Sequence, residues 1–90
     1  MPDATLKRYE VKILPSAQRD LDDLEKSVFL RIIPVLQGLS INPRPQGSIK
    51  LSAEEGYRVR VGSYRIVYRI DDKARAVFVY RVKHRREVYR

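Results

Sequence analysis

The chain has 90 residues, no cysteine, one histidine, and 19 basic against 11 acidic side chains, for a formal net charge of +8. This length indicates one small domain, residues 1–90, and 43% hydrophobic residues are enough for a modest core. The lack of cysteine excludes disulfides and thiolate metal sites, and no metal site or cofactor is expected. The charge predicts an anionic partner such as nucleic acid.

The N-terminal part predicts one strand and one helix. Residues 9–13 alternate apolar and polar side chains, as a half-buried strand does. Pro15 suits the first turn of a helix, and apolar residues then recur at helical spacing up to about Lys26. No apolar signal-peptide core precedes them, so we expect a cytoplasmic protein without membrane contact.

A second helix is predicted directly after the first. Ser27 suits its N-cap, and its apolar stripe runs from Phe29 to Leu39. Pro34 lies inside this stripe and lacks a backbone donor, so we expect a kink or a break there. Residues 42–47 form a loop with strong turn signals, so the two helices make an αα-hairpin.

The remainder predicts strands. A short strand around 48–51 precedes strands at 57–61, 64–70 and 76–82, and Gly62-Ser63 forms a two-residue hairpin loop. The order β-α-α-β-β-β predicts an α+β fold, in which the helical hairpin covers one face of an antiparallel-rich sheet and leaves the other face open.

The basic residues concentrate in the C-terminal third. Residues 57–90 hold eleven basic and three acidic side chains, which accounts for the whole net charge. The hairpin pairs Arg60 with Arg65, and such opposed like charges destabilise a sheet by up to about 1 kcal/mol. Four arginines are expected to be exposed on the open face: Arg58, Arg60, Arg65 and Arg69. Planar guanidinium groups favour two-pronged phosphate contacts, so we interpret this face as a phosphate-binding surface rather than a solvated one.

Two further residues are candidates for proton transfer. Histidine is the side chain whose ordinary pKa lies nearest neutrality, and His84 follows the last strand. A structural role for His84 is an equally good interpretation. Tyr89 is an aromatic that packs the tail down, a platform that stacks on a base, or a proton-transfer group. The last role requires neighbouring arginines to stabilise the phenolate.

Two strings, GYRVRVGSYRIVY at 56–68 and HRREVY at 84–89, resemble the RelE toxins of bacterial and archaeal toxin–antitoxin modules. The loop at 42–45, the length and the element order also match, so the resemblance covers essentially the whole chain. It implies a ribosome-dependent, metal-independent endoribonuclease. Such an enzyme cuts messenger RNA in the ribosomal decoding site by attack of the RNA's own 2′-OH, which inhibits translation.

The resemblance also implies roles for single residues. Arg58 and Arg60 resemble a basic pair that contacts the substrate, and Arg65 resembles the arginine that steadies the scissile phosphate. Arg85 resembles a basic residue near the leaving group, with Lys83 as a competing match. Tyr89 resembles a terminal tyrosine that stacks on a base and assists proton transfer. The candidate catalytic residues are Arg58, Arg65, His84, Arg85 and Tyr89, and the candidate RNA-binding residues are Arg58, Arg60, Arg69, Lys83 and Arg86.

Two features depart from the family's best-known pattern. Arginine replaces lysine at Arg58 and Arg60, which keeps the charge but makes a general-base role there less favourable. No C-terminal helix of the kind some members carry is expected.

The resemblance implies a cognate antitoxin as partner. A segment able to cover a surface of net charge +8 is predicted to be acidic. One alternative is a ParE-like DNA gyrase inhibitor, which shares the scaffold but cuts nothing, although the basic tail at 84–89 argues against it. A second alternative is a nucleic-acid-binding module without catalysis.

Overall fold

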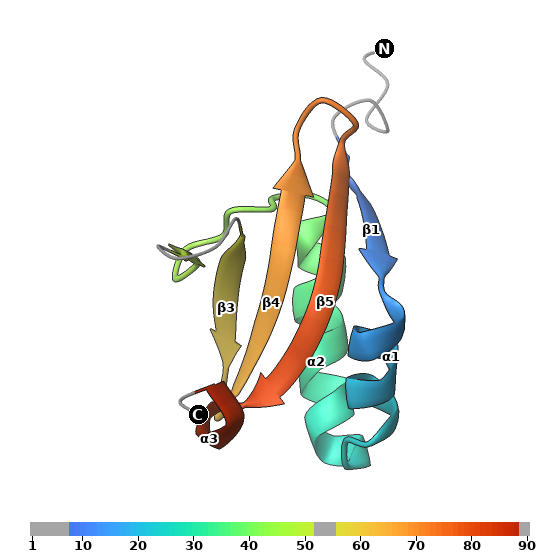
Figure 1. The fold of residues 1–90 in the computed structure, drawn as a ribbon, viewed down its shortest axis with the longest axis vertical. Coiled ribbons are helices and arrows are strands. Elements are labelled where there is room, and N and C mark those ends of the chain that lie inside the picture. Colours follow the sequence, from blue (N-terminus) through green and yellow to red (C-terminus); the bar gives the residue numbers. More distant parts are fainter. Residues whose placement is uncertain (1–7, 52–55, 89–90) are drawn as a thin grey trace.

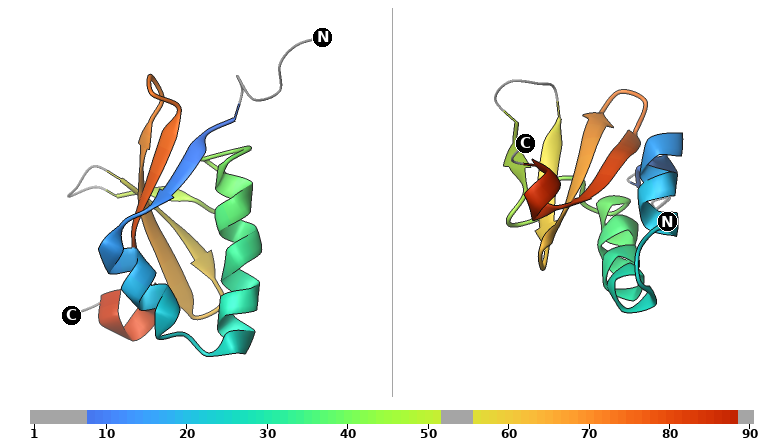
Figure 2. Two further views of the ribbon diagram at one scale, coloured as in Figure 1. Left: turned by 90° about the vertical axis from the view of Figure 1, so that its right-hand side faces the viewer. Right: turned by 60° about the horizontal axis from the view of Figure 1, so that its bottom comes forward.

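A computed structural model describes residues 8–51 and 56–88 of the chain. Its elements are β1 (Glu10–Ile13), α1 (Pro15–Asp22), α2 (Lys26–Leu39), β2 (Ile49–Lys50), β3 (Tyr57–Val61), β4 (Tyr64–Asp71), β5 (Ala76–His84) and α3 (Arg85–Val88). The hairpin of α1 and α2 lies on one side of the sheet, and α3 lies at one end of the opposite side (Figures 1 and 2). The predicted α+β fold is confirmed.

The sheet has five strands in the order β1-β5-β4-β3-β2. β1 runs parallel to β5, and the other neighbours are antiparallel. The short strand predicted around 48–51 is the edge strand β2. The β3–β4 register pairs Val61 with Tyr64 and Arg60 with Arg65, as the two-residue loop predicts. Gly62 opens that loop at φ +59°, a conformation that favours glycine.

Some element boundaries differ from the sequence prediction. α1 already ends at Asp22, and Glu25 rather than Ser27 is the N-cap of α2. α2 continues through Pro34 without a break. Pro34 and Leu30 are both exposed, so water can bind the Leu30 carbonyl that loses its usual donor. A single helical turn, α3, follows β5, where the sequence predicts none.

The hydrophobic core lies between α1, α2 and the sheet. Tyr68 of β4 is fully buried, and its hydroxyl donates a hydrogen bond to the Pro43 carbonyl at 2.8 Å. Burying one valine, leucine or isoleucine side chain in such a core contributes roughly 1.5–3 kcal/mol. The fully or nearly fully buried partners of Tyr68 in the core are Ala17, Leu21, Ile32, Leu36, Leu39, Val59, Ile66, Val77, Val79 and Val82.

β5 contains a β-bulge. Tyr68 of β4 pairs with Val79, and the preceding Val67 pairs with Arg81, so Tyr80 is an extra residue of β5 at this point. One extra residue in a strand reverses the alternation of the side chains that follow it.

The reversal decides which side chains of β5 reach the open face. Lys83 pairs with Arg65, which lies on the open face of β4. His84 pairs with Tyr64, whose ring packs against the core on the helix side. A regular strand would place Lys83 and His84 the other way around.

Candidate nucleic-acid-binding site

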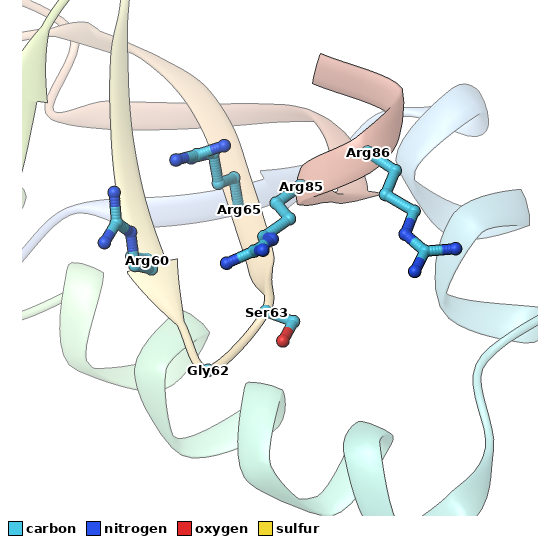
Figure 3. A pocket seen from close by; sticks show the side chains of 6 residues that line it. All are labelled: Arg60, Gly62, Ser63, Arg65, Arg85 and Arg86. Carbon is cyan, nitrogen blue, oxygen red and sulfur yellow. The ribbon is translucent and has the colours of Figure 1, made fainter. Parts of the chain in front are cut away.

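Four arginines gather at the α3 end of the open face, and we refer to them as the arginine cluster: Arg60, Arg65, Arg85 and Arg86 (Figure 3). Together with Gly62 and Ser63 they line a cleft of about 580 Å³. The side chains of Arg60, Arg65 and Arg85 extend toward one another, whereas Arg86 extends away from them (Figure 3).

Strand register and one backbone hydrogen bond create this cluster. Arg60, Arg65 and Lys83 are direct cross-strand neighbours on β3, β4 and β5. The amide of Arg85 donates a hydrogen bond to the Ser63 carbonyl at 2.7 Å, which ties the start of α3 to the hairpin loop. This bond brings Arg85 to the strand ends that carry Arg60 and Arg65.

Arg65 differs from its neighbours in burial. It is 3% exposed, so the prediction of an exposed guanidinium is wrong for this residue, whereas Arg60 is exposed. Burying a charge costs free energy unless it is compensated. Arg65 therefore lines the cleft with a guanidinium group that is almost fully shielded from solvent.

The cleft is electropositive. No carboxylate lines it within residues 8–51 and 56–86. A cleft lined by charges of one sign concentrates the opposite ion, and guanidinium groups match the geometry of phosphate oxygens. The arrangement suits a phosphodiester that contacts several arginines at once.

The structure separates His84 from the arginine cluster. Its ring meets the Tyr64 ring edge-on at 5.2 Å between centroids, and its Nδ1 accepts a hydrogen bond from the Arg86 amide at 3.2 Å. It lines a different, smaller cleft of about 240 Å³ together with residues of α2 and the hairpin, among them Arg31. The other proton-transfer candidate, Tyr89, lies outside the described residues.

The remaining candidates are distributed along the open face. Arg58 is half-buried and pairs with Val67, one row away from Arg60. Arg69 lies four residues beyond Arg65 on β4, about 13 Å away at the usual rise per residue. It lines a second cleft of about 510 Å³ near the β4–β5 turn.

A polar network closes this second end of the sheet. Asp72 of the β4–β5 turn accepts hydrogen bonds from Arg44 at 2.8 and 3.2 Å and from the Tyr9 hydroxyl at 2.6 Å. The bonds from Arg44 and then from Tyr9 lower the pKa of Asp72 to about 2. Arg44 also donates to the Tyr57 hydroxyl at 3.2 Å. The network joins the residue before β1, the loop before β2 and the β4–β5 turn.

Sequence reasoning missed Ser63, whose carbonyl anchors α3, and Phe78, which lines the second cleft. Phe78 was detectable, because it alternates with the buried Val77 and Val79. No three histidine or acidic side chains among the described residues are grouped so that they could hold a metal ion. In the same part of the chain, every helix is too short or too polar to cross a membrane.

Comparison with known proteins identifies the family. Residues 11–89 match the family described as ParE toxin of type II toxin-antitoxin system, parDE. Toxin RelG of Mycobacterium tuberculosis is 33% identical over 84 residues, which cover 91% of this chain and 97% of the relative.

Solved structures agree with this assignment. The toxin-antitoxin complex RelBE2 from Mycobacterium tuberculosis contains a chain with a TM-score of 0.77 and 31% identity, covering 86% of this chain and 98% of that one. The archaeal RelE-RelB complex from Pyrococcus horikoshii OT3 gives a TM-score of 0.74 and 25% identity, with 87% and 96% covered. The chain therefore belongs to the RelE/ParE superfamily and is a type II toxin–antitoxin toxin of the RelE family.

Proposed function

We propose that this toxin is a ribosome-dependent, metal-independent endoribonuclease that cleaves messenger RNA in the decoding site and so inhibits translation. The observation that carries the proposal is the convergence of Arg60, Arg65 and Arg85 on one cleft, with no carboxylate among its lining residues in the described chain. A phosphodiester in this cleft meets two or three guanidinium groups.

The chemistry needs little more than charge and position. The 2′-oxygen of the RNA attacks the adjacent phosphorus, the bond from phosphorus to the 5′-oxygen breaks, and the products are a 2′,3′-cyclic phosphate and a 5′-hydroxyl. Negative charge builds on the non-bridging oxygens during this step. Arginines that are already in place stabilise that charge without reorganisation.

We assign roles by position in the cluster. Arg65, which is buried, steadies the scissile phosphate, and Arg85 contacts the phosphate near the leaving oxygen, with Lys83 as its competitor. Arg58 and Arg60 bind the RNA strand, and Arg86 adds a contact with the RNA at the outside of the arginine cluster. Arginine is a poor general base, so alignment of the 2′-oxygen by the ribosome has to supply much of the rate enhancement.

Proton transfer is assigned to the tail. The 2′-hydroxyl must lose a proton and the 5′-oxygen must gain one. Tyr89 is the first candidate. For His84, the contacts with Tyr64 and with the Arg86 amide favour a structural role over proton transfer.

A translating extract tests the proposal. The wild-type toxin should cut messages and leave 2′,3′-cyclic phosphate ends, and Arg65→Ala should lower the cleavage rate about 10²–10³-fold. Because Arg65 is buried, circular dichroism must show that the variant is folded, and Arg85→Ala offers a second test at an exposed position. Arg19→Ala on α1 is the matched control. Intact messages with wild-type toxin, or undiminished cleavage by folded Arg65→Ala and Arg85→Ala, contradict the proposal.

A second candidate function is inhibition of DNA gyrase. The match of residues 11–89 to the ParE toxin family favours this function. Gyrase inhibition requires binding to a protein and does not require a cleft for a phosphodiester. It predicts inhibited supercoiling by purified gyrase that persists in Arg65→Ala and Arg85→Ala. Cleavage of messenger RNA without any effect on supercoiling excludes gyrase inhibition.

We further propose that a RelB-type antitoxin with an acidic toxin-binding segment neutralises this chain. The similar chains from Mycobacterium tuberculosis and Pyrococcus horikoshii are in toxin–antitoxin complexes, and the net charge of +8 here favours an acidic partner. Calorimetry at increasing salt should show a progressively weaker complex. A salt-independent affinity indicates a mainly apolar interface instead.

A further inference from the structure

The open face carries a second cleft at the end opposite the arginine cluster, near the β4–β5 turn. Its volume is about 510 Å³, which lies within the range of small-molecule sites. Phe78 and Arg69, which pair across β5 and β4, line it from the open face, whereas Tyr57 and its partner Lys50 belong to the helix-side face of Tyr68. Arg44 and Lys73 are the other cations of the lining. Aromatic rings beside cations are the combination that single-stranded nucleic acids require, because bases stack and phosphates need positive charge.

Phe78 is the central feature of this cleft. It lies on β5, between Lys12 of β1 and Arg69 of β4, which are its cross-strand partners. The Lys12 ammonium is 5.9 Å from the ring centroid and the Arg69 guanidinium carbon is 5.7 Å from it. These distances are near the outer limit of about 6 Å for cation–π contact, so neither cation is held tightly by the ring.

The acidic residues of the cleft already have partners in the protein. Asp72 accepts hydrogen bonds from Arg44 and Tyr9, and Asp71 accepts one from the Ala74 amide at 3.0 Å. Lys12 has a carboxylate, that of Glu10, at 4.0 Å, the outer limit of an ion pair. The carboxylates therefore neutralise the positive charge of Arg44 far more than that of Arg69.

We propose that this cleft is a second RNA-binding subsite, which holds an unpaired nucleotide of the strand whose scissile phosphate lies in the arginine cluster. The base stacks on Phe78, and Arg69 with Lys12 contacts the neighbouring phosphates. The inference rests on the proposed function. Arg65 and Arg69 lie about 13 Å apart on one strand, and a stacked single strand advances about 3.4 Å per nucleotide. The two sites are thus about four nucleotides apart, with Arg58 between them.

A length series of RNA tests the subsite. Fluorescence anisotropy is measured with 2′-O-methyl RNA, which lacks the attacking hydroxyl, as a trinucleotide and as a nonanucleotide. Phe78→Leu should bind the nonanucleotide about tenfold more weakly than wild type, because stacking on one ring is lost. The trinucleotide, which fills the arginine cluster alone, should bind within about twofold of wild type. Phe78→Trp keeps a ring and should restore the affinity for the nonanucleotide.

Charge variants provide matched controls. Lys12→Gln should weaken binding of the nonanucleotide, whereas Lys26→Gln, at the start of α2, removes the same charge from the other side of the molecule and should not. An equal loss for both RNA lengths in Phe78→Leu identifies a structural role for the ring and overturns the inference. Unchanged affinity for the nonanucleotide also overturns it, as does a loss of antitoxin binding with RNA binding intact.

These outcomes differ from a failure of the proposed function. If Phe78→Leu binds the nonanucleotide like wild type while Arg65→Ala abolishes cleavage, the proposed subsite is wrong and the proposed nuclease function stands. If messages stay intact in the translating extract but Phe78→Leu loses RNA affinity, the subsite stands as part of an RNA-binding protein.

Discussion

The Asp20 carboxylate of α1 accepts a hydrogen bond from the Val82 amide of β5 at 2.8 Å, just after the bulge. The same carboxylate binds the Arg81 guanidinium at 2.9 and 3.2 Å. β1 ends at Ile13, so α1 supplies this edge of β5 with partners that a strand would otherwise provide. Asp20 thereby holds the bulge that brings Lys83 to the open face.

Replacement of Asp20 by alanine should lower the free energy of unfolding by about 1.5–3 kcal/mol, because hydrogen bonds to a charged group are lost at a largely buried position. Burial raises the pKa of Asp20, but the bonds from Arg81 and Val82 outweigh this and lower it overall. Urea unfolding measures the change. Asp22→Ala, an exposed position on the same helix, should change stability by no more than about 0.5 kcal/mol. Equal effects at both positions would contradict the role given to Asp20.

The β3–β4 hairpin could be predicted in detail from the sequence, and the end of β5 could not. A two-residue loop fixes the register of its strands, so the pairing of Arg60 with Arg65 follows from local sequence. The bulge depends on Asp20, a residue of a helix some sixty positions earlier, and a strand carries no local signal for such a partner. For this reason the face on which His84 lies could not be predicted from the sequence. The burial of Arg65 was equally out of reach, because it depends on how distant segments pack.

Replacement of His84 by glutamine should change the cleavage rate in the translating extract by no more than about threefold. The ring lies on the helix side of the sheet against Tyr64, away from Arg60, Arg65 and Arg85. The melting temperature should fall instead, because the contact with Tyr64 is lost. Arg85→Ala serves as the comparison with impaired catalysis. A general acid or base typically contributes 10²–10⁴-fold, so a loss of about that size in His84→Gln would assign proton transfer to this residue.

The arginine cluster also predicts how RNA binding responds to salt. Each phosphate contact adds about 0.7 to the slope of the logarithm of affinity against the logarithm of salt concentration for a single strand. Arg60→Gln and Arg85→Gln should each reduce this slope by about that amount, as measured by fluorescence anisotropy with 2′-O-methyl RNA. Arg19→Gln on α1 should leave the slope unchanged. A slope that responds equally to all three variants would indicate binding to the overall charge rather than to the cleft.

Acid should destabilise the protein partly through Asp72. Its pKa is about 2 in the fold, against an ordinary value of 3.8, so its contribution is complete above about pH 4 and is lost as the pH falls toward 2. Thermal melting of wild type and Asp72→Asn should therefore show a lower melting temperature for the variant at pH 6 and nearly equal values at pH 2. A difference that stays constant with pH would mean that the charge on Asp72 is unimportant.

The pairing of β1 with β5 delays the folding of the sheet during synthesis of the chain. Glu10 lies beside Ala76 and Ile13 beside Val79, so the sheet stays unfinished until nearly the whole chain has been made. Arg85 comes later still, and its amide must reach Ser63 before the cleft exists. A nascent chain that has not yet formed this hydrogen bond therefore holds most of the arginines without the assembled cleft.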